Sequence, residues 1–102
     1  MKALRAALLL SFGFAAGIHG SDSLERARQL EQSGEAAQAR DLLARAARQA
    51  PSSGAALSDY AEFLDRYGDP ARADAYAKLL VLLDKSGDRL KRAAVAERLA
   101  EL

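Results

Sequence analysis

The chain has 102 residues, half of them hydrophobic, with 15 basic and 14 acidic side chains and a formal net charge of +1. This length fits one small domain, and the lack of cysteine excludes disulfides, thiolate metal sites and thiol nucleophiles. The single histidine, His19, cannot build a metal site or a Ser-His pair alone, and the charge signs alternate rather than forming a basic cluster. We therefore expect no cofactor, no metal and no nucleic-acid partner.

The first twenty residues have the pattern of a secretory signal peptide. Lys2 and Arg5 precede an uncharged apolar run over residues 6–18. This run of 13 residues is shorter than the roughly 20 that a helix needs to span a bilayer. Small side chains favour cleavage after Gly17, with a cut after Gly20 as the other option. The sequence thus predicts export to the periplasm or cell envelope; the alternative is an uncleaved apolar helix that packs on the domain or anchors it in a membrane.

A helical hairpin is predicted next, from helices over residues 22–33 and 35–50. Leu24, Ala27 and Leu30 recur at helical spacing, and Gly34 allows the left-handed turn that ends the first helix. Pro51 stops the second helix because it lacks the amide hydrogen that continues the ladder.

A second hairpin and a last helix follow the break at residues 51–54. One helix closes at Gly68; Asp69 is a suitable cap for the next, over residues 70–85, with Pro70 at its first position. The last helix is expected over residues 88–102. Abundant Ala and Leu and few β-branched residues agree with this all-α reading. Four aromatic residues are interpreted as core or rim packing rather than as ligand contacts: Tyr60, Phe63, Tyr67 and Tyr76.

The two hairpins match each other at a spacing of 34 residues. The matched pairs are Leu30 and Leu64, Gly34 and Gly68, Ala39 and Ala73, Leu43 and Ala77, and Ala46 and Leu80. Such self-similarity is typical of stacked helical repeats, which bury their apolar faces against neighbouring units. The prediction is an all-α solenoid of α-hairpin repeats with about five helices in a domain over residues 21–102. Its units span residues 20–53 and 54–87, and a terminal helix spans 88–102.

These residues resemble the tetratricopeptide repeat (TPR) family, whose unit is a 34-residue helix-turn-helix with small residues where its helices cross. The second unit matches better, although Ala77 and Leu80 swap the usual sizes. In the first unit, Ser23 and Arg26 stand where large apolar residues are expected, so its first helix should pack less firmly. The competing prediction is an unrelated bundle of about five helices.

The resemblance implies a groove, lined by the first helices of successive units, that holds a peptide or a partner's helix. The residues that would face it are Arg28, Glu31, Gln32, Ser58, Glu62, Asp65, Arg66 and Arg92. The acidic side chains of Asp59, Glu62 and Asp65 do not suit the acidic chaperone tails that some family members bind. An ordinary solvated helix face is the alternative interpretation of these charges.

The last helix is expected to offer a docking edge. Two units fall short of the three that a stable stack usually needs, so the terminal helix, a second copy or a partner should complete it. Val95, Leu99 and Leu102 are the apolar residues expected at this edge.

The leading functional hypothesis is a non-catalytic adaptor that is exported to the cell envelope and binds another protein or peptide, with self-association as a possibility. The first alternative is a membrane-tethered recruiter, if the leader stays uncut. The second is a small enzyme that uses Glu62 and Asp65 as acid and base, which no phosphate loop, nucleophile or metal cluster in the sequence supports. The sequence does not identify the partner or the pathway, and the chain could be part of a longer protein.

Overall fold

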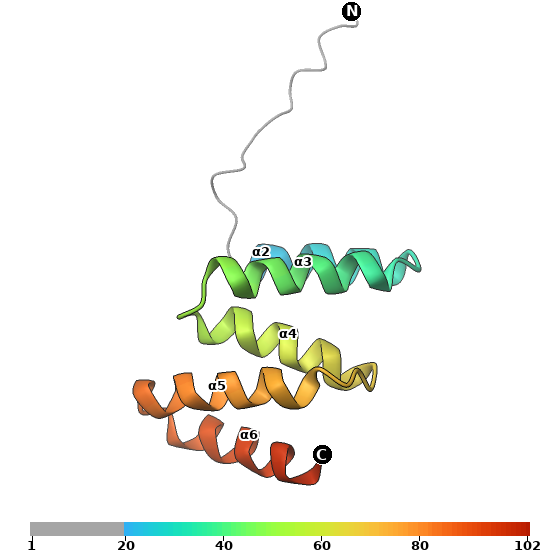
Figure 1. Ribbon diagram of the computed structural model, residues 1–102. Coiled ribbons are helices and arrows are strands. Elements are labelled where there is room, and N and C mark those ends of the chain that lie inside the picture. Colours follow the sequence, from blue (N-terminus) through green and yellow to red (C-terminus); the bar gives the residue numbers. More distant parts are fainter. Residues whose placement is uncertain (1–19) are drawn as a thin grey trace, which may run out of the picture.

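The computed structural model describes residues 20–102, which form helices joined by short turns (Figure 1). The helices are α2 (Gly20–Gln32), α3 (Ala36–Gln49), α4 (Gly54–Arg66), α5 (Arg72–Ser86) and α6 (Arg89–Glu101). These residues include no strand, which confirms the predicted all-α class. The predicted leader lies outside the described residues except for Gly20, where α2 begins, so signal-peptide cleavage and export stay predictions.

Glycine ends the first helix of each hairpin, as predicted. Gly34 has φ of 81° and Gly68 has φ of 64°, in the left-handed region that a side chain disfavours. The amide of Glu35 then bonds to the carbonyl of Leu30 at 2.8 Å. The amide of Asp69 donates to the carbonyl of Leu64 at 2.9 Å, so both helices end in the same hydrogen-bonded turn.

Side-chain caps start two of the later helices. The Ser53 hydroxyl accepts a hydrogen bond from the amide of Ala56, and the Asp88 carboxylate accepts one from the amide of Lys91, each at 3.1 Å. These bonds satisfy amides that have no partner within the helix. Gly54, predicted to belong to the break, is instead the first residue of α4.

Each helix packs against the next one in the chain, and α2 also packs against α4 (Figure 1). No Cα atom of α3 comes within 8 Å of one in α5, and the same holds for α4 and α6. The helices α3 and α5 therefore flank α4 without touching each other through their backbones. This spacing leaves part of α4 accessible between them.

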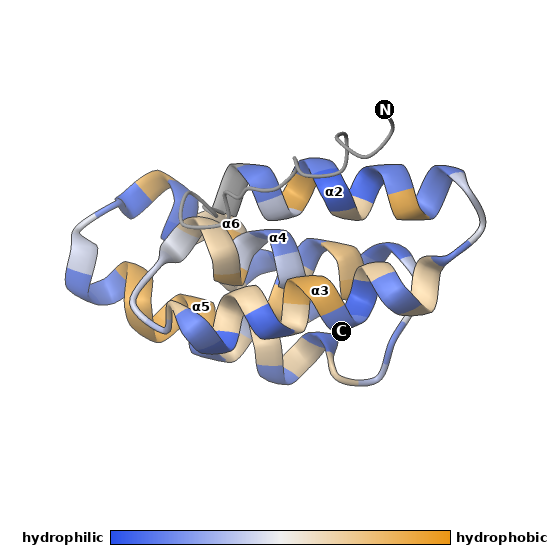
Figure 2. Cartoon of the chain, turned by 90° about the horizontal axis from the view of Figure 1, so that it is seen from above, coloured by the Kyte–Doolittle hydropathy of each residue, from blue (hydrophilic) through white to orange (hydrophobic). Residues whose placement is uncertain are grey.

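The core is a continuous layer of small and branched side chains between the helices. Its largest fully buried members are Leu43 on α3, Leu64 on α4 and Leu79 on α5. Hydrophobic and hydrophilic residues alternate along each helix, as expected when one face is buried (Figure 2). Each buried leucine contributes roughly 1.5–3 kcal/mol through removal of its apolar surface from water.

The spacing of 34 holds for the first helices of the hairpins. Ala27 and Ala61 are both fully buried, and Leu30 and Leu64 are both buried. The match is wrong for the second helices, because Leu43 is buried whereas Ala77, 34 positions later, is exposed. Three buried residues of α3 have buried counterparts 36 positions later: Ala39 and Ala75, Leu43 and Leu79, and Ala47 and Leu83.

A longer turn in the second hairpin causes the change of spacing. The helical ladder of α3 starts with the amide of Ala39 bonded to Glu35, and that of α5 starts with Ala75 bonded to Ala71, 36 positions later. Asp69 explains the delay, since its carboxylate accepts from the amide of Ala71 at 2.8 Å and its carbonyl accepts from Arg72. The sequence predicted Pro70 as the first residue of this helix. That prediction is wrong, because Pro70 lies in the turn before α5, which begins at Arg72.

Candidate functional site

Four of the eight residues predicted to line a groove on the first helices bond to one another, in the pairs Glu31–Arg66 and Ser58–Glu62. Glu31 on α2 accepts a hydrogen bond from Arg66 on α4 at 2.9 Å and another from the Tyr67 hydroxyl at 3.1 Å. The hydrogen bond to Glu31 raises the pKa of the Tyr67 hydroxyl. On the same face, Gln32 is exposed at the end of α2. The contacts of Glu31 and Arg66 bridge α2 and α4 and leave neither side chain free.

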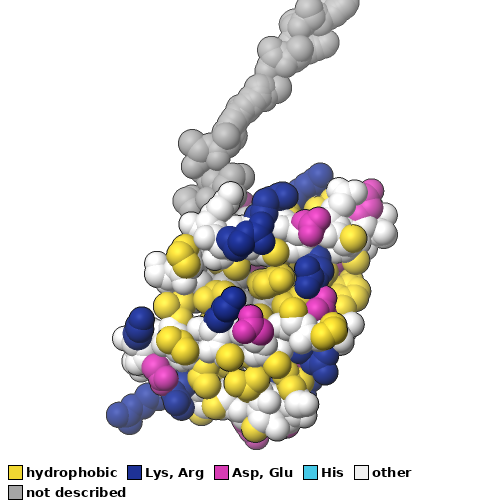
Figure 3. Space-filling view, in the orientation of Figure 1, with side chains coloured by type: hydrophobic (Ala, Val, Ile, Leu, Met, Phe, Trp, Pro, Cys, Tyr) yellow, Lys and Arg dark blue, Asp and Glu magenta, His cyan; other side chains and the backbone are white. Residues whose placement is uncertain are grey.

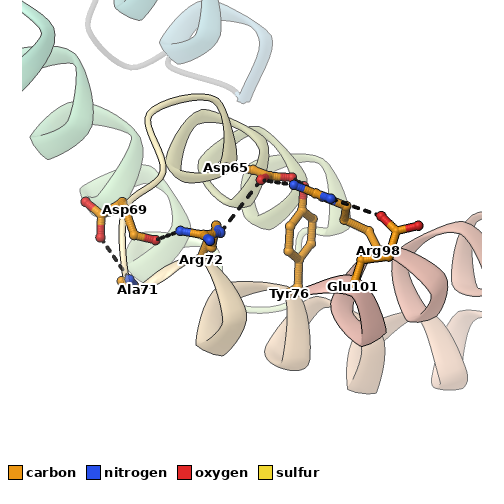
Figure 4. A network of polar contacts seen from close by, with 7 residues as sticks. All are labelled: Asp65, Asp69, Ala71, Arg72, Tyr76, Arg98 and Glu101. Carbon is orange, nitrogen blue, oxygen red and sulfur yellow. Dashed lines mark hydrogen bonds and ion pairs between the residues drawn. The ribbon is translucent and has the colours of Figure 1, made fainter.

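Asp65 is the centre of a polar network that joins three helices (Figure 4). Arg98 on α6 donates to both of its carboxylate oxygens at 2.8 Å, and the Tyr76 hydroxyl on α5 donates at 2.8 Å. The bond to Arg98, followed by that to Tyr76, lowers the pKa of Asp65 to about 2. Burial, with the bond to Asp65, raises the pKa of Tyr76 to about 12. Asp65 is thus ionised and fully engaged at neutral pH.

Two arginines extend this network around the second turn. Arg72 on α5 donates to the backbone carbonyl of Asp69 at 3.1 Å, while its Nε atom lies 3.8 Å from Asp65, too far for a hydrogen bond. Arg40 on α3 donates to the Asp69 carboxylate at 2.8 Å, which lowers the pKa of Asp69. The network therefore fixes α3, α5 and α6 around the end of α4.

The remaining polar residues of this face are arranged more loosely. Ser58 is buried and donates to the Glu62 carboxylate at 3.0 Å. Burial, with the nearby charge of Glu62, raises the pKa of Asp59, and the charge of Arg28 opposes this shift. Arg92 on α6 pairs with Asp84 on α5, the helix that precedes it in the chain. The structure thus brings Arg28, Asp59 and Glu62 together, but separates Arg92 from them.

The predicted docking edge on α6 is only partly exposed. Val95 is 7% exposed and belongs to the core, so it cannot serve as part of an edge. Leu99 is half-buried against the core, and Leu102 is 40% exposed. Leu90, which the prediction did not include, is 87% exposed. The exposed large hydrophobic side chains of this segment, Leu90 and Leu102, therefore lie near the two ends of α6.

A large hollow lies between α3 and α5, on the side of the molecule formed by the second helices of the hairpins (Figure 3). It has a volume of about 710 Å³. Its floor and walls are apolar and come from three helices: Ala44 and Ala47 of α3, Leu57 and Tyr60 of α4, and Ala75, Val81 and Leu82 of α5. We call this hollow the α3–α5 groove.

Charged side chains form the rim of the α3–α5 groove. Arg48 comes from α3, and Asp74, Lys78 and Lys85 come from α5. Lys78 pairs with Asp74 at 3.3 Å, in an exposed contact one helical turn apart. Within residues 20–102, Arg48 and Lys85 make no ion pair. The rim therefore carries a net positive charge.

The sequence analysis missed this groove, although a signal for it was present. Lys78 and Lys85 are seven residues apart, which places them on one face of a helix with Val81 and Leu82 between them. The 34-residue alignment obscured that face, since it placed Ala73 and Ala77 on the apolar face and left out Ala75, which is buried. The alignment at 36 residues identifies the correct face of α5.

Metal-binding clusters and membrane-spanning helices are both absent from the described part of the chain. Residues 20–102 hold no group of three His, Cys, Asp or Glu side chains that could bind a metal ion. None of the five described helices combines the length and hydrophobicity that crossing a membrane requires. The α3–α5 groove is thus the best-formed candidate binding site of the described residues.

Comparison with known proteins gave no relative. No family model matches the chain, no curated protein matches its sequence, and no solved structure matches its fold.

Proposed function

We propose that this protein is a non-catalytic adaptor of the TPR type, built from two helical hairpins and a terminal helix, that binds another protein or peptide. The α3–α5 groove carries the proposal, because it combines a concave apolar floor with a charged rim. Helix-lined grooves of this kind accept an extended peptide or one face of an amphipathic helix. Its volume of about 710 Å³ accommodates several side chains of such a segment.

The repeat assignment is supported by the shared geometry of the hairpins. Both first helices end at a glycine with positive φ, and the buried faces of α2 and α4 match at 34 residues. The second turn is two residues longer than the 34-residue unit allows, which is a departure from the TPR family pattern. The second unit keeps its core despite this insertion, because its buried residues in α5 lie 36 positions after the buried residues of α3.

Enzyme function has weak support from the geometry. In the carboxylate pair Glu62 and Asp65, Asp65 has a pKa of about 2, which makes it a poor proton donor or acceptor near neutral pH. The α3–α5 groove has an apolar floor and a rim of lysine, arginine and one paired aspartate, without a nucleophile beside a base. An interaction role fits these groups better.

Export to the cell envelope is proposed from residues 1–20 alone. The mass of the protein recovered from its host separates the two forms: loss of residues 1–17 or 1–20 supports a cleaved leader and a released adaptor. Retention of the whole segment in a membrane fraction supports the tethered recruiter instead.

Site-specific photo-crosslinking of the full chain in its host tests the adaptor proposal. A photoreactive residue is placed at Val81 in the α3–α5 groove, at Glu62 on the first-helix face, or at Leu90 on α6. Each position is exposed, so the probe should leave the fold intact. A discrete protein adduct at any one position supports an adaptor. Lack of an adduct at all three, with the chain folded and abundant, contradicts it.

A further inference from the structure

We infer that the α3–α5 groove binds an acidic amphipathic helix of a partner protein, with the apolar face of that helix on the groove floor and its carboxylates against Arg48 and Lys85. This inference rests on the proposed adaptor function and specifies its site and ligand. It concerns the second helices of the hairpins, whereas the family resemblance implies a groove on the first helices.

The size and shape of the groove suit a helix. From Ala71, the residue before α5, to Lys85 in its last turn, the groove lining is about 21 Å long at about 1.5 Å of rise per residue. A guest helix of about four turns has the same length. Several lining residues are alanines, so a helix backbone can approach closely over Ala44, Ala47 and Ala75.

The exposed apolar surface of α5 also points to an occupant. Val81 is 57% exposed although it lies beside the groove floor, between two lysines on the same face. Covering this side chain removes apolar surface from water, which favours association. The buried part of Tyr60 already lies in the floor, so a guest would extend the core outward from α4.

Charge decides between the possible occupants. The rim has three cations and one anion, and Asp74 is already paired with Lys78. A second copy docking through α6 would bring four basic and two acidic residues of that helix, and so would be repelled. The chain's own residues 1–20 contain Lys2 and Arg5 and no acidic residue, so they are also mismatched. An acidic partner segment is complementary.

The two cations that make no ion pair within residues 20–102 lie toward one end of the groove. Arg48 is in the last turn of α3, and Lys85 is in the last turn of α5. Their side chains can converge on carboxylates at one end of a guest helix, while Val81 and Leu82 contact its apolar face. This asymmetry gives the bound helix a preferred direction.

A binding measurement with designed probes tests the inference. The acidic probe is a fluorescein-labelled 14-residue peptide with leucines at positions 2, 6, 9 and 13 and glutamates beside them. A second probe replaces the glutamates with lysines, and a third scrambles the acidic sequence so that its leucines no longer share one face. Fluorescence anisotropy with the full chain measures the affinity of each probe.

The acidic probe should bind, and both other probes should bind about tenfold or more weakly. Raising the salt concentration from about 0.05 M to about 0.5 M should weaken the acidic probe several-fold, because exposed charges are screened. No binding of the acidic probe at about 1 mM, or equal binding of all three, would overturn the inference.

Charge reversal locates the site. In the variant Arg48→Glu with Lys85→Glu, the acidic probe should lose about tenfold in affinity and the lysine probe should gain a similar factor. The matched control is Arg45→Glu with Arg89→Glu, which changes the net charge equally on exposed positions outside the groove. Equal weakening in both variants would show general charge attraction and overturn the inference.

Two further results separate this inference from the adaptor proposal. An adduct at Glu62 or Leu90 without one at Val81 leaves the adaptor function standing and removes the groove from it. Binding to phosphatidylglycerol vesicles through Arg48 and Lys85, without binding of the acidic probe, assigns the rim to a lipid surface and overturns the inference.

Discussion

The two hairpins share one plan but differ in the size of the buried side chains and in the length of the turn. Ser23 in the first hairpin corresponds to Leu57 in the second, 34 positions later, and both are buried. Ala47 corresponds to Leu83, 36 positions later. The second hairpin therefore buries more apolar surface, and its extra turn residues, Pro70 and Ala71, shift α5 along the sequence without changing the face that it buries.

This difference teaches that a repeat can keep its packing while its sequence period changes. If a helix starts two residues later in the sequence, the face that it presents to the core rotates by about 200°, at about 100° per residue. The same face stays buried only if the apolar residues also shift by two positions. In α5 the pattern has shifted, so Ala75 and Leu79 occupy the places that Ala39 and Leu43 have in α3. The exposed strip on α5 that includes Val81 and Lys78 is a consequence of this shift.

The largest effect is expected from removing the inserted residues. Deletion of Pro70 and Ala71 restores the 34-residue spacing and should turn Tyr76, Leu79 and Leu83 away from the core. The expected loss of stability is on the order of 5 kcal/mol, since each buried side chain contributes roughly 1.5–3 kcal/mol. Urea unfolding followed by circular dichroism measures it.

The control for this deletion is a Gly-Ser insertion between Pro51 and Ser52, which are both exposed in the turn between the hairpins. It should cost less than about 1 kcal/mol, because lengthening a surface loop is cheap. A deletion variant as stable as the parent would show that the 34-residue alignment of α5 was right after all.

Leucine truncation compares the two cores directly. Leu79→Ala and Leu43→Ala should each cost about 2–5 kcal/mol, with Leu79 toward the upper end because its hairpin has the larger neighbours. Native-state hydrogen exchange should show that Leu43→Ala exposes the amides of α2 and α3 first, while α4 and α5 stay protected.

Leu90→Ala is the matched control, since its side chain is 87% exposed, and it should change stability by less than about 0.5 kcal/mol. Uniform loss of protection across all helices in Leu43→Ala would mean that the hairpins unfold as one unit. The two hairpins would then not differ in local stability.

The Asp65 network is centred on α4 of the second hairpin, and Asp65 should make the protein sensitive to acid. Its folded pKa of about 2 lies below its ordinary value of 3.8, so its contribution is present above pH 3.8 and is lost as the pH falls toward 2. Asp65→Asn should cost about 1–2 kcal/mol at pH 7 and should flatten the pH dependence of stability in that window.

Asp74→Asn serves as the control for Asp65→Asn. Asp74 pairs with Lys78 across an exposed contact, with 72% of its side chain accessible, so the change should stay within about 0.5 kcal/mol. An unchanged acid profile in Asp65→Asn would place the acid-sensitive bond elsewhere, with Asp69 as the next carboxylate whose pKa is lowered.

The smallest expected effects concern the glycines. Gly34→Ala should cost about 1 kcal/mol, because φ of 81° is unfavourable for a side chain even though a Cβ atom there meets nothing within 4 Å. Gly54→Ala, in the first turn of α4, should be neutral or stabilising by about 0.5 kcal/mol. Thermal unfolding of both variants measures the difference, and equal shifts would contradict the assigned turn.

Much of the fold was predictable because its signals are local. The positions of Gly34, Pro51, Gly68 and Asp88 gave all the described helices with ends within two residues of those found. The period of α5 was predicted wrongly because it depends on how Asp69 bonds in the turn, and a cap at Asp69 fits either start of the helix.

The site was less predictable than the fold. The predicted groove residues Glu31, Asp65 and Arg66 are paired within the chain, since bonds between distant residues such as Asp65 and Arg98 depend on the final packing. Val95 was placed at an edge for its hydrophobicity, although the same property buries it under α5. The α3–α5 groove arises from the separation of two helices that never adjoin in sequence.

Chemical-shift mapping by NMR tests most directly the claim that the α3–α5 groove is the binding surface. Titration of the ¹⁵N-labelled chain with the acidic amphipathic probe should perturb the amides of Ala47, Ala75 and Leu82, while those of Arg28 and Glu62 stay in place. Shifts confined to Arg28 and Glu62 on the first helices would contradict the account.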